Sequence, residues 1–246
     1  MPRTRAPKDD RPQKVAKNSK QHKKQNSGMQ LMQVKPKTYA QGEIIQAFYE
    51  NHLLLHGPAG TGKTFIPMYL ALREILEEGA RSPYRKIVVI RSVVATRDMG
   101  HLPGTKEEKM APYETPYREI SNELCMRGDA YDLLKQKGII EFECTGYLRG
   151  TTIKDAIIIV DEAQNCSEHE LDTIITRVGE NSKIVLCGDY NQSDLRGKEK
   201  EGFKFVIGVL QTLSKFESVQ FAHADIVRSE FVKSYIIARD EARAKQ

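Results

Sequence analysis

One eight-residue segment restricts the possible folds of this chain more than any other feature of its sequence. Residues Gly57 to Thr64 read GPAGTGKT, fit the pattern GxxxxGK[ST], and lie between the apolar run LLLH and an amphipathic stretch. Glycines let the backbone turn so that successive N–H groups point inward, and the following helix presents its positive end there. The segment therefore predicts a phosphate-binding loop between a strand and a helix.

Each position of this loop has an expected task if the ligand is ATP with Mg²⁺. Lys63 is expected to reach the β and γ phosphates, and the Thr64 hydroxyl to ligate Mg²⁺. The other cofactor-binding residues of the loop are Gly57, Pro58, Ala59, Gly60, Thr61 and Gly62. The alternative is a glycine-rich turn that only joins strand to helix, but such a turn has no need for Lys followed by Thr.

From about Val34 onward, short apolar runs alternate with longer helical patterns, which is typical of an α/β fold with one parallel sheet flanked by helices. The expected strands are His52 to His56, Lys86 to Arg91, Ile139 to Glu143, Ala156 to Val160, Lys183 to Gly188 and Ser218 to Ala222. The expected helices are Gly42 to Glu50, Lys63 to Glu78, Pro116 to Lys137, Glu168 to Val178, Gly202 to Leu213 and Ile226 to Ala244. Ser92 to Pro116 is rich in Gly, Pro and charge and is predicted to be a long functional loop.

Two further motifs each end a predicted strand in polar residues. Residues 157–164 read IIIVDEAQ, so that Asp161 and Glu162 follow a buried strand at the edge where α/β sheets bind ligands. Asp161 is expected to hold Mg²⁺, and Glu162 to orient and deprotonate the attacking water. Residues 183–192 read KIVLCGDYNQ, and Gln192 could contact both the γ phosphate and that water. Alone, these motifs would indicate a helix N-cap and an Asp-containing turn.

The composition divides the chain into two parts. Residues 1–28 hold nine Lys or Arg against two Asp, a balance of +7, so the total of +5 leaves −2 for the rest. We expect a basic, disordered arm over 1–28 and a single RecA-like P-loop ATPase domain over 29–246. The arm could attract nucleic acid, or it could be a solvated tail that only aids solubility.

The composition also excludes some protein classes. No apolar stretch approaches the roughly 20 residues that cross a bilayer, and no apolar signal-peptide core follows the basic N-terminus. The cysteines are widely spaced, without a CxxC pair; they are Cys125, Cys144, Cys166 and Cys187. We expect a reduced, cytoplasmic protein without membrane contact.

The trio GPAGTGKT, VDEAQ and GDYNQ resembles the N-terminal RecA-type core of superfamily 1 helicases and, more closely, the PhoH-like family of bacterial and phage ATPases. The resemblance runs from about Val34 to Ala238. It includes the upstream Pro36, Thr38 and Gln41, the segment LPGTKEEK at 102–109, YLRGT at 147–151 and DIVR at 225–228. It implies a P-loop NTPase that binds ATP and Mg²⁺.

The resemblance implies roles for two residues outside the three motifs. Gln41 would recognise the adenine edge, although it could simply begin a helix. Arg228 would be an arginine finger for the phosphates, with Arg177 as a weaker candidate, although most arginines near a helix start are surface groups.

The expected partners are RNA or single-stranded DNA and further copies of the chain. About 50 residues follow Gln192, too few for a second RecA lobe, so Arg228 or a neighbour is predicted to act in trans in a hexameric ring. By resemblance, Arg91, Arg97, Lys106 to Lys109 and Arg149 are available for strand contacts. Bases could stack on Tyr113, Tyr117 and Tyr147, unless these tyrosines only pack.

Three functions remain compatible with the sequence. The first is an ATPase that remodels RNA or single-stranded DNA, as a helicase does. The second is an ATP-dependent switch or scaffold that does not translocate. A small-molecule kinase is disfavoured, because the two later motifs provide water activation and no evident acceptor pocket.

Overall fold

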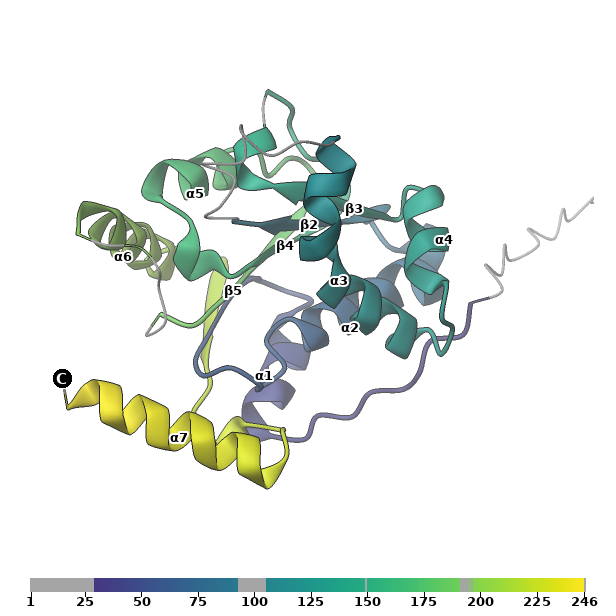
Figure 1. Cartoon of the computed structure of the whole chain (residues 1–246). Coiled ribbons are helices and arrows are strands. Elements are labelled where there is room, and N and C mark those ends of the chain that lie inside the picture. The colour runs from purple at the N-terminus through teal and green to yellow at the C-terminus, as the bar shows by residue number, and fades with distance from the viewer. Residues whose placement is uncertain (1–28, 93–104, 149, 191–194, 196, 246) are drawn as a thin grey trace, which may run out of the picture.

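The computed structural model describes residues 29–92, 105–148, 150–190, 195 and 197–245. Within these ranges six strands form one sheet in the order β3-β2-β4-β5-β1-β6, and every neighbouring pair is parallel (Figure 1). The strands are β1 (His52–His56), β2 (Lys86–Arg91), β3 (Ile140–Cys144), β4 (Ala156–Asp161), β5 (Lys183–Gly188) and β6 (Phe216–Gln220). The predicted α/β fold with a single parallel sheet is confirmed.

Helices connect the strands and cover both faces of the sheet. They are α1 (Tyr39–Ala47), α2 (Phe65–Arg73), α3 (Lys106–Leu124), α4 (Ala130–Gln136), α5 (Glu168–Ile175), α6 (Lys198–Gln211) and α7 (Glu230–Ala244). A π-helical turn, Glu74–Glu78, extends α2. Short 3-10 turns lie at Gly79–Arg81, Thr145–Tyr147, Ala163–Asn165 and His223–Asp225.

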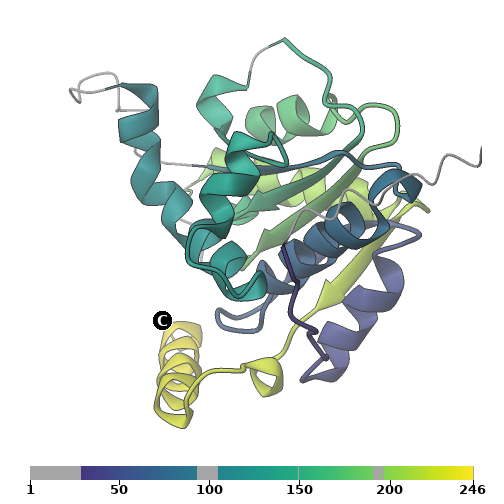
Figure 2. The same ribbon diagram turned by 90° about the vertical axis from the view of Figure 1, so that its right-hand side faces the viewer.

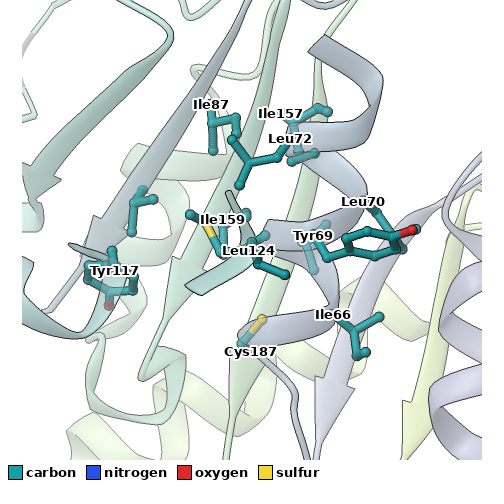
Figure 3. Close-up of a cluster of buried hydrophobic side chains, with 14 of the residues drawn as sticks. Ile66, Tyr69, Leu70, Leu72, Ile87, Tyr117, Leu124, Ile157, Ile159 and Cys187 are labelled. Carbon is teal, nitrogen blue, oxygen red and sulfur yellow. The ribbon is translucent and has the colours of Figure 1, made fainter. Parts of the chain in front are cut away.

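Alternating side chains of the strands enter two separate hydrophobic clusters. In β4, Ile157 and Ile159 face the cluster formed with α1 to α4, whereas Ile158 and Val160 face the cluster formed with α5 and α6. Figure 3 shows part of the first cluster, in which Ile157 and Ile159 lie near Leu72 of α2. Because the central strands are buried on both faces, they are continuous aliphatic runs.

The prediction was wrong for the segment between β2 and β3. Thr105 forms a capping box with Glu108, so α3 begins inside the expected loop and runs through Pro112 and Pro116. The single helix expected over 116–137 is divided, because Met126 has φ of 50° and ends the helical path after Leu124. Proline and charge suggested a loop, but burial of one face of α3 outweighs them.

Other differences are small shifts of element ends. Strand β6 begins two residues earlier than predicted, α1 begins three residues earlier behind its Thr38 cap, and α7 begins at Glu230 rather than Ile226. The predicted arm over 1–28 lies outside the described residues. In the described part of the chain, every helix is too short or too polar to cross a membrane.

The register of the sheet brings the sequence motifs to one edge. His56, just before the glycine-rich loop, pairs with Gly188 of β5, and Arg91 of β2 pairs with Asp161 of β4. Strand β5 lies between β1 and β4. The loop after β1 and the carboxylates after β4 therefore flank the same carboxyl end of the sheet.

A buried lysine at the start of β5 makes stability depend on pH. Lys183 Nζ donates to the Asn51 carbonyl at 3.0 Å and lies 4.8 Å from the Phe48 ring centre. Burial lowers the pKa of Lys183 from 10.5 to about 8, against an opposing effect of Glu74. Folding thus disfavours the charged form of Lys183. The lysine loses its proton at a lower pH in the folded chain than in the unfolded chain.

We expect the urea-measured free energy of unfolding to gain a contribution from Lys183 as the pH rises from about 8 to 10.5. The Lys183→Met variant should lack that gain, since it has no amine to neutralise. Identical pH dependence of the two proteins over this interval would contradict the prediction.

Candidate nucleotide-binding site

The glycine-rich loop after β1 has a backbone that only glycine tolerates at several positions. Gly57, Gly60 and Gly62 have φ of 142°, 81° and 90°. A Cβ on Gly57 would lie 2.4 Å from the Phe221 carbonyl oxygen, and one on Gly60 would lie 2.8 Å from Arg228 Cγ. The loop is thus closely enclosed by the segment after β6.

Lys63 lies over this loop. Its Nζ donates to the carbonyl oxygens of Gly57 at 2.7 Å and Pro58 at 2.5 Å. Burial lowers the pKa of the Lys63 ammonium, while Asp189 acts in the opposite direction. The lysine is therefore held at the mouth of the loop by weak main-chain acceptors, which phosphate oxygens could replace with stronger charge-assisted bonds.

Thr64 and Asp161 are in direct contact although 97 residues separate them. The Thr64 Oγ1 hydroxyl donates to Asp161 Oδ1 at 2.8 Å. A hydroxyl and a carboxylate are the hard oxygen ligands that Mg²⁺ accepts, and Mg²⁺ at phosphate sites takes few protein ligands. Among the described residues there is no cluster of three His, Cys, Asp or Glu. The donor set fits Mg²⁺ shared with a nucleotide rather than a metal held by protein alone.

Glu162 is held in a left-handed conformation, with φ 52° and ψ 39°. Its Oε2 accepts from Gln164 Nε2 at 2.6 Å, and Arg91 Nη2 lies 4.0 Å from its Oε1. The Gln164 Oε1 in turn accepts from the Asp189 main-chain N–H at 3.0 Å. Glu162 makes no side-chain capping bond to the turn it precedes, so the N-cap interpretation does not apply to it.

Gln41 and Arg228 both contact the glycine-rich loop. Gln41 is buried, its Nε2 donates to the Thr61 carbonyl at 2.9 Å, and its Oε1 accepts from the Lys37 N–H at 2.8 Å. The Val227 N–H donates to the Gly60 carbonyl at 3.0 Å, and the Arg228 side chain lies along Gly60. This arginine borders the loop of its own chain, so its placement does not support the prediction that it acts in trans.

For three predicted residues the structure gives no position. Gln192, Arg97 and Arg149 lie outside the described residues. The Arg177 carbonyl accepts from the Ile153 N–H, upstream of β4, so this arginine is at the opposite edge of the sheet from the glycine-rich loop of its own chain.

Sequence reasoning named Tyr117 as a residue that stacks on bases or packs, but it predicted neither the contact of Tyr117 with Asp161 nor that of Gln164 with Glu162. Tyr117 is fully buried and donates to Asp161 Oδ2 at 2.8 Å, so it cannot stack on bases. Burial, followed by the charge of Asp161, raises the pKa of Tyr117 well above its usual value, so the hydroxyl remains a donor. The sequence feature that indicates burial of Tyr117 is its spacing of seven residues from both Met110 and Leu124, which places it on the buried stripe of α3.

A family model described as "PhoH-like protein" matches residues 33–239. The chain belongs to the PhoH-like family. A PhoH-like protein of Mycobacterium leprae is 33% identical over 209 residues, 85% of this chain and 59% of that protein. A PhoH-like protein of Bacillus subtilis is also 33% identical, over 85% of this chain and 64% of that protein. This chain thus spans roughly three fifths of these relatives' length.

Solved structures are more distant than these PhoH-like relatives. The large terminase of bacteriophage HK97 has a TM-score of 0.49 and 13% identity, over 87% of this chain and 48% of that one. The UvsW helicase of bacteriophage T4 has a TM-score of 0.43 and 19% identity, over 80% of this chain and 64% of that one. The parallel sheet, the glycine-rich loop between β1 and α2, and the family match together show that this PhoH-like chain has the fold of a P-loop NTPase.

The enclosure of the loop predicts that Gly57 tolerates no side chain. Gly57→Ala should lower the free energy of unfolding by about 1 to 3 kcal/mol, because the new Cβ meets the Phe221 carbonyl at a positive φ. The matched control is Gly208→Ala in α6, where a Cβ has open space. This substitution should raise the free energy of unfolding by about 0.5 to 1 kcal/mol. Urea unfolding measures both, and equal stability of the two variants would contradict the prediction.

Proposed function

We propose that this chain hydrolyses ATP and that hydrolysis is coupled to binding or remodelling of RNA or single-stranded DNA. The observation that carries the proposal is the 2.8 Å hydrogen bond from Thr64 to Asp161. It joins the phosphate-binding loop to the strand end whose next residue, Glu162, is a carboxylate suited to activating water.

Each residue has a separate task in this proposal. Main-chain N–H groups of the loop and the Lys63 ammonium bind the phosphates, and Thr64 with Asp161 hold Mg²⁺. When bound, Mg²⁺ would neutralise charge on the phosphate oxygens. Glu162 takes a proton from water, and its hydrogen bond from Gln164 fixes the carboxylate in place.

Three residues would complete the reaction and its specificity. Arg228 lies along Gly60 of its own chain, so we propose that it stabilises phosphate charge in cis. Gln192 remains proposed as the side chain that senses the γ phosphate. Gln41 uses one donor and one acceptor on the chain itself, which leaves one of each for an adenine edge.

We expect Lys63→Ala and Glu162→Gln to damage ATP hydrolysis in different ways. Lys63→Ala should weaken nucleotide binding roughly 10- to 100-fold, because charge-assisted bonds to phosphate are lost. Glu162→Gln should preserve binding and lower kcat about 100-fold or more, because the amide cannot accept the proton. A coupled phosphate-release assay and binding of a fluorescent ATP analogue measure the two effects.

The surface pair Lys154 and Glu180, with Nζ and Oε2 3.6 Å apart, provides matched controls. These residues precede β4 and β5, at the opposite edge of the sheet from the site, so Lys154→Ala and Glu180→Gln should hydrolyse ATP at the wild-type rate. Wild-type turnover in Glu162→Gln would show that the assigned base is wrong.

Nucleic acid distinguishes the proposal from a switch or scaffold that only binds ATP. Support comes from the balance of +7 over residues 1–28, since a run of cations binds phosphate backbones by releasing counterions. For the proposed function, single-stranded RNA or DNA should accelerate ATP hydrolysis, and salt should weaken that effect. An unchanged rate at saturating nucleic acid would favour the switch.

We also propose that the chain forms a homo-oligomer, as a hexameric ring. Support comes from α7, which lies outside the helical layers of the sheet (Figure 2) and exposes Phe231 by 81% and Tyr235 by 60%. These aromatic side chains are one turn apart, and such surfaces commonly bind other proteins. Because α7 follows Arg228 directly, a second copy seated on it would lie near the nucleotide site.

Sedimentation velocity tests this surface. We expect wild type to sediment as a species larger than a monomer, and the Phe231→Glu/Tyr235→Glu double variant to shift to the monomer, because buried carboxylates oppose association. Gln211→Glu, exposed on α6, is the control and should retain the wild-type state. A monomeric wild type with Mg²⁺ and nucleotide bound at full ATPase rate would contradict the ring.

A further inference from the structure

Both carboxylate oxygens of Asp161 are engaged by hydroxyl groups. Oδ1 accepts from Thr64 at 2.8 Å, and Oδ2 accepts from Tyr117 at 2.8 Å. Thr64 belongs to the glycine-rich loop, whereas Tyr117 comes from α3 and is not part of any of the nucleotide motifs. Two donors on opposite oxygens fix the plane of the carboxylate, which one donor alone would leave free to turn.

The surroundings of Tyr117 show that its hydroxyl has a task that packing does not explain. Its ring is fully buried and packs against Phe142 of β3 with ring centres 5.5 Å apart. Figure 3 shows Tyr117 at one side of the hydrophobic cluster, with Ile159 and Leu124 toward its centre. Phenylalanine would fill the same apolar space without a polar group to satisfy, and the Tyr117 hydroxyl is satisfied by Asp161.

The position of Tyr117 depends on how α3 is seated. Glu114, one turn earlier and also buried, binds Lys135 of α4 at 2.7 Å and accepts from the Tyr131 hydroxyl at 3.1 Å. These bonds and the apolar stripe of α3 hold the helix against α4 and the sheet. A movement of α3 would therefore move the Tyr117 hydroxyl relative to Asp161.

A nearby positive charge, that of Arg91, could attract the Asp161 carboxylate away from its contact with Thr64. Arg91 is the register partner of Asp161 on β2, and its Nη2 lies 4.0 Å from Oε1 of the neighbouring Glu162. Without the Tyr117 hydroxyl, Asp161 would be free to turn toward this guanidinium and away from the geometry it shares with Thr64.

We propose that Tyr117 is a positioning residue for Asp161, and that it makes the affinity for Mg²⁺ at the nucleotide site depend on the seating of α3. The inference rests on the proposed function, since it assigns Asp161 to Mg²⁺. Partners that orient a metal-binding carboxylate commonly change metal affinity 10- to 100-fold.

The test is Tyr117→Phe, which removes one oxygen atom and retains the ring. Binding of a fluorescent ADP analogue is titrated with Mg²⁺ by fluorescence anisotropy, in the full chain and without hydrolysis. We expect metal-free binding of the analogue to be unchanged and the Mg²⁺ concentration for half-maximal effect to rise about tenfold. In the ATPase assay, Tyr117→Phe should have a lower kcat at limiting Mg²⁺, and excess Mg²⁺ should restore most of it. A variant with a misfolded site would not recover in this way.

Tyr69→Phe is the matched control. It removes the hydroxyl of another buried tyrosine in the same hydrophobic cluster, on α2, which points away from Tyr117 in Figure 3, and it should leave the Mg²⁺ requirement at the wild-type value. If Tyr117→Phe does not fold, Phe142→Leu loosens the Tyr117 ring without removing its hydroxyl and should raise the requirement about threefold.

The outcomes separate the inference from the function on which it rests. A wild-type Mg²⁺ requirement in Tyr117→Phe, or in Phe142→Leu where that variant replaces it, overturns the inference alone, and so does an equal rise in Tyr69→Phe. If wild type binds the analogue without any dependence on Mg²⁺, the proposed function fails and the inference fails with it.

Discussion

The hydrogen bond between Thr64 and Asp161 is the contact on which the proposed chemistry depends. It joins the last residue of the glycine-rich loop to the end of β4, which lies two positions from β1 in the sheet. Neither residue could act on a metal alone, because a single hydroxyl or a single carboxylate is a weak Mg²⁺ site. The parallel register carries both to the same edge, and the buried aliphatic faces of β4 and β5 fix that register.

Around this contact, neighbouring groups limit the freedom of each functional side chain. Gln164 bridges Glu162 to the Asp189 N–H, and Gly188 makes room for it, since a Cβ there would lie 2.7 Å from the Gln164 oxygen. Tyr117 holds the other oxygen of Asp161. A site that is held in place before its substrate binds loses less entropy during the reaction, which favours catalysis.

The sequence predicted much of the fold and part of the site, for identifiable reasons. Five of the six strands were predicted to within one residue at each end. Four of them are unbroken aliphatic runs between polar turns, and β3 alternates buried and half-buried residues. Helix α3 was missed in its first half, because its prolines and charges are local signals of a loop, whereas its stability comes from contacts with α4 and the sheet. For Tyr117 the sequence left base stacking and packing both open, because burial is a tertiary property.

The sequence by itself determined which chemical groups are available and in what order along the chain. The segment GPAGTGKT lies between a strand and a helix, and its glycines adopt positive φ values at little cost, so the conformation of this turn is a local property. Only the tertiary structure decided which distant groups meet. It placed Arg228 along Gly60 of its own chain, Arg177 at the far edge, and a tyrosine hydroxyl on Asp161, because strand order and helix packing determine distances that sequence spacing does not.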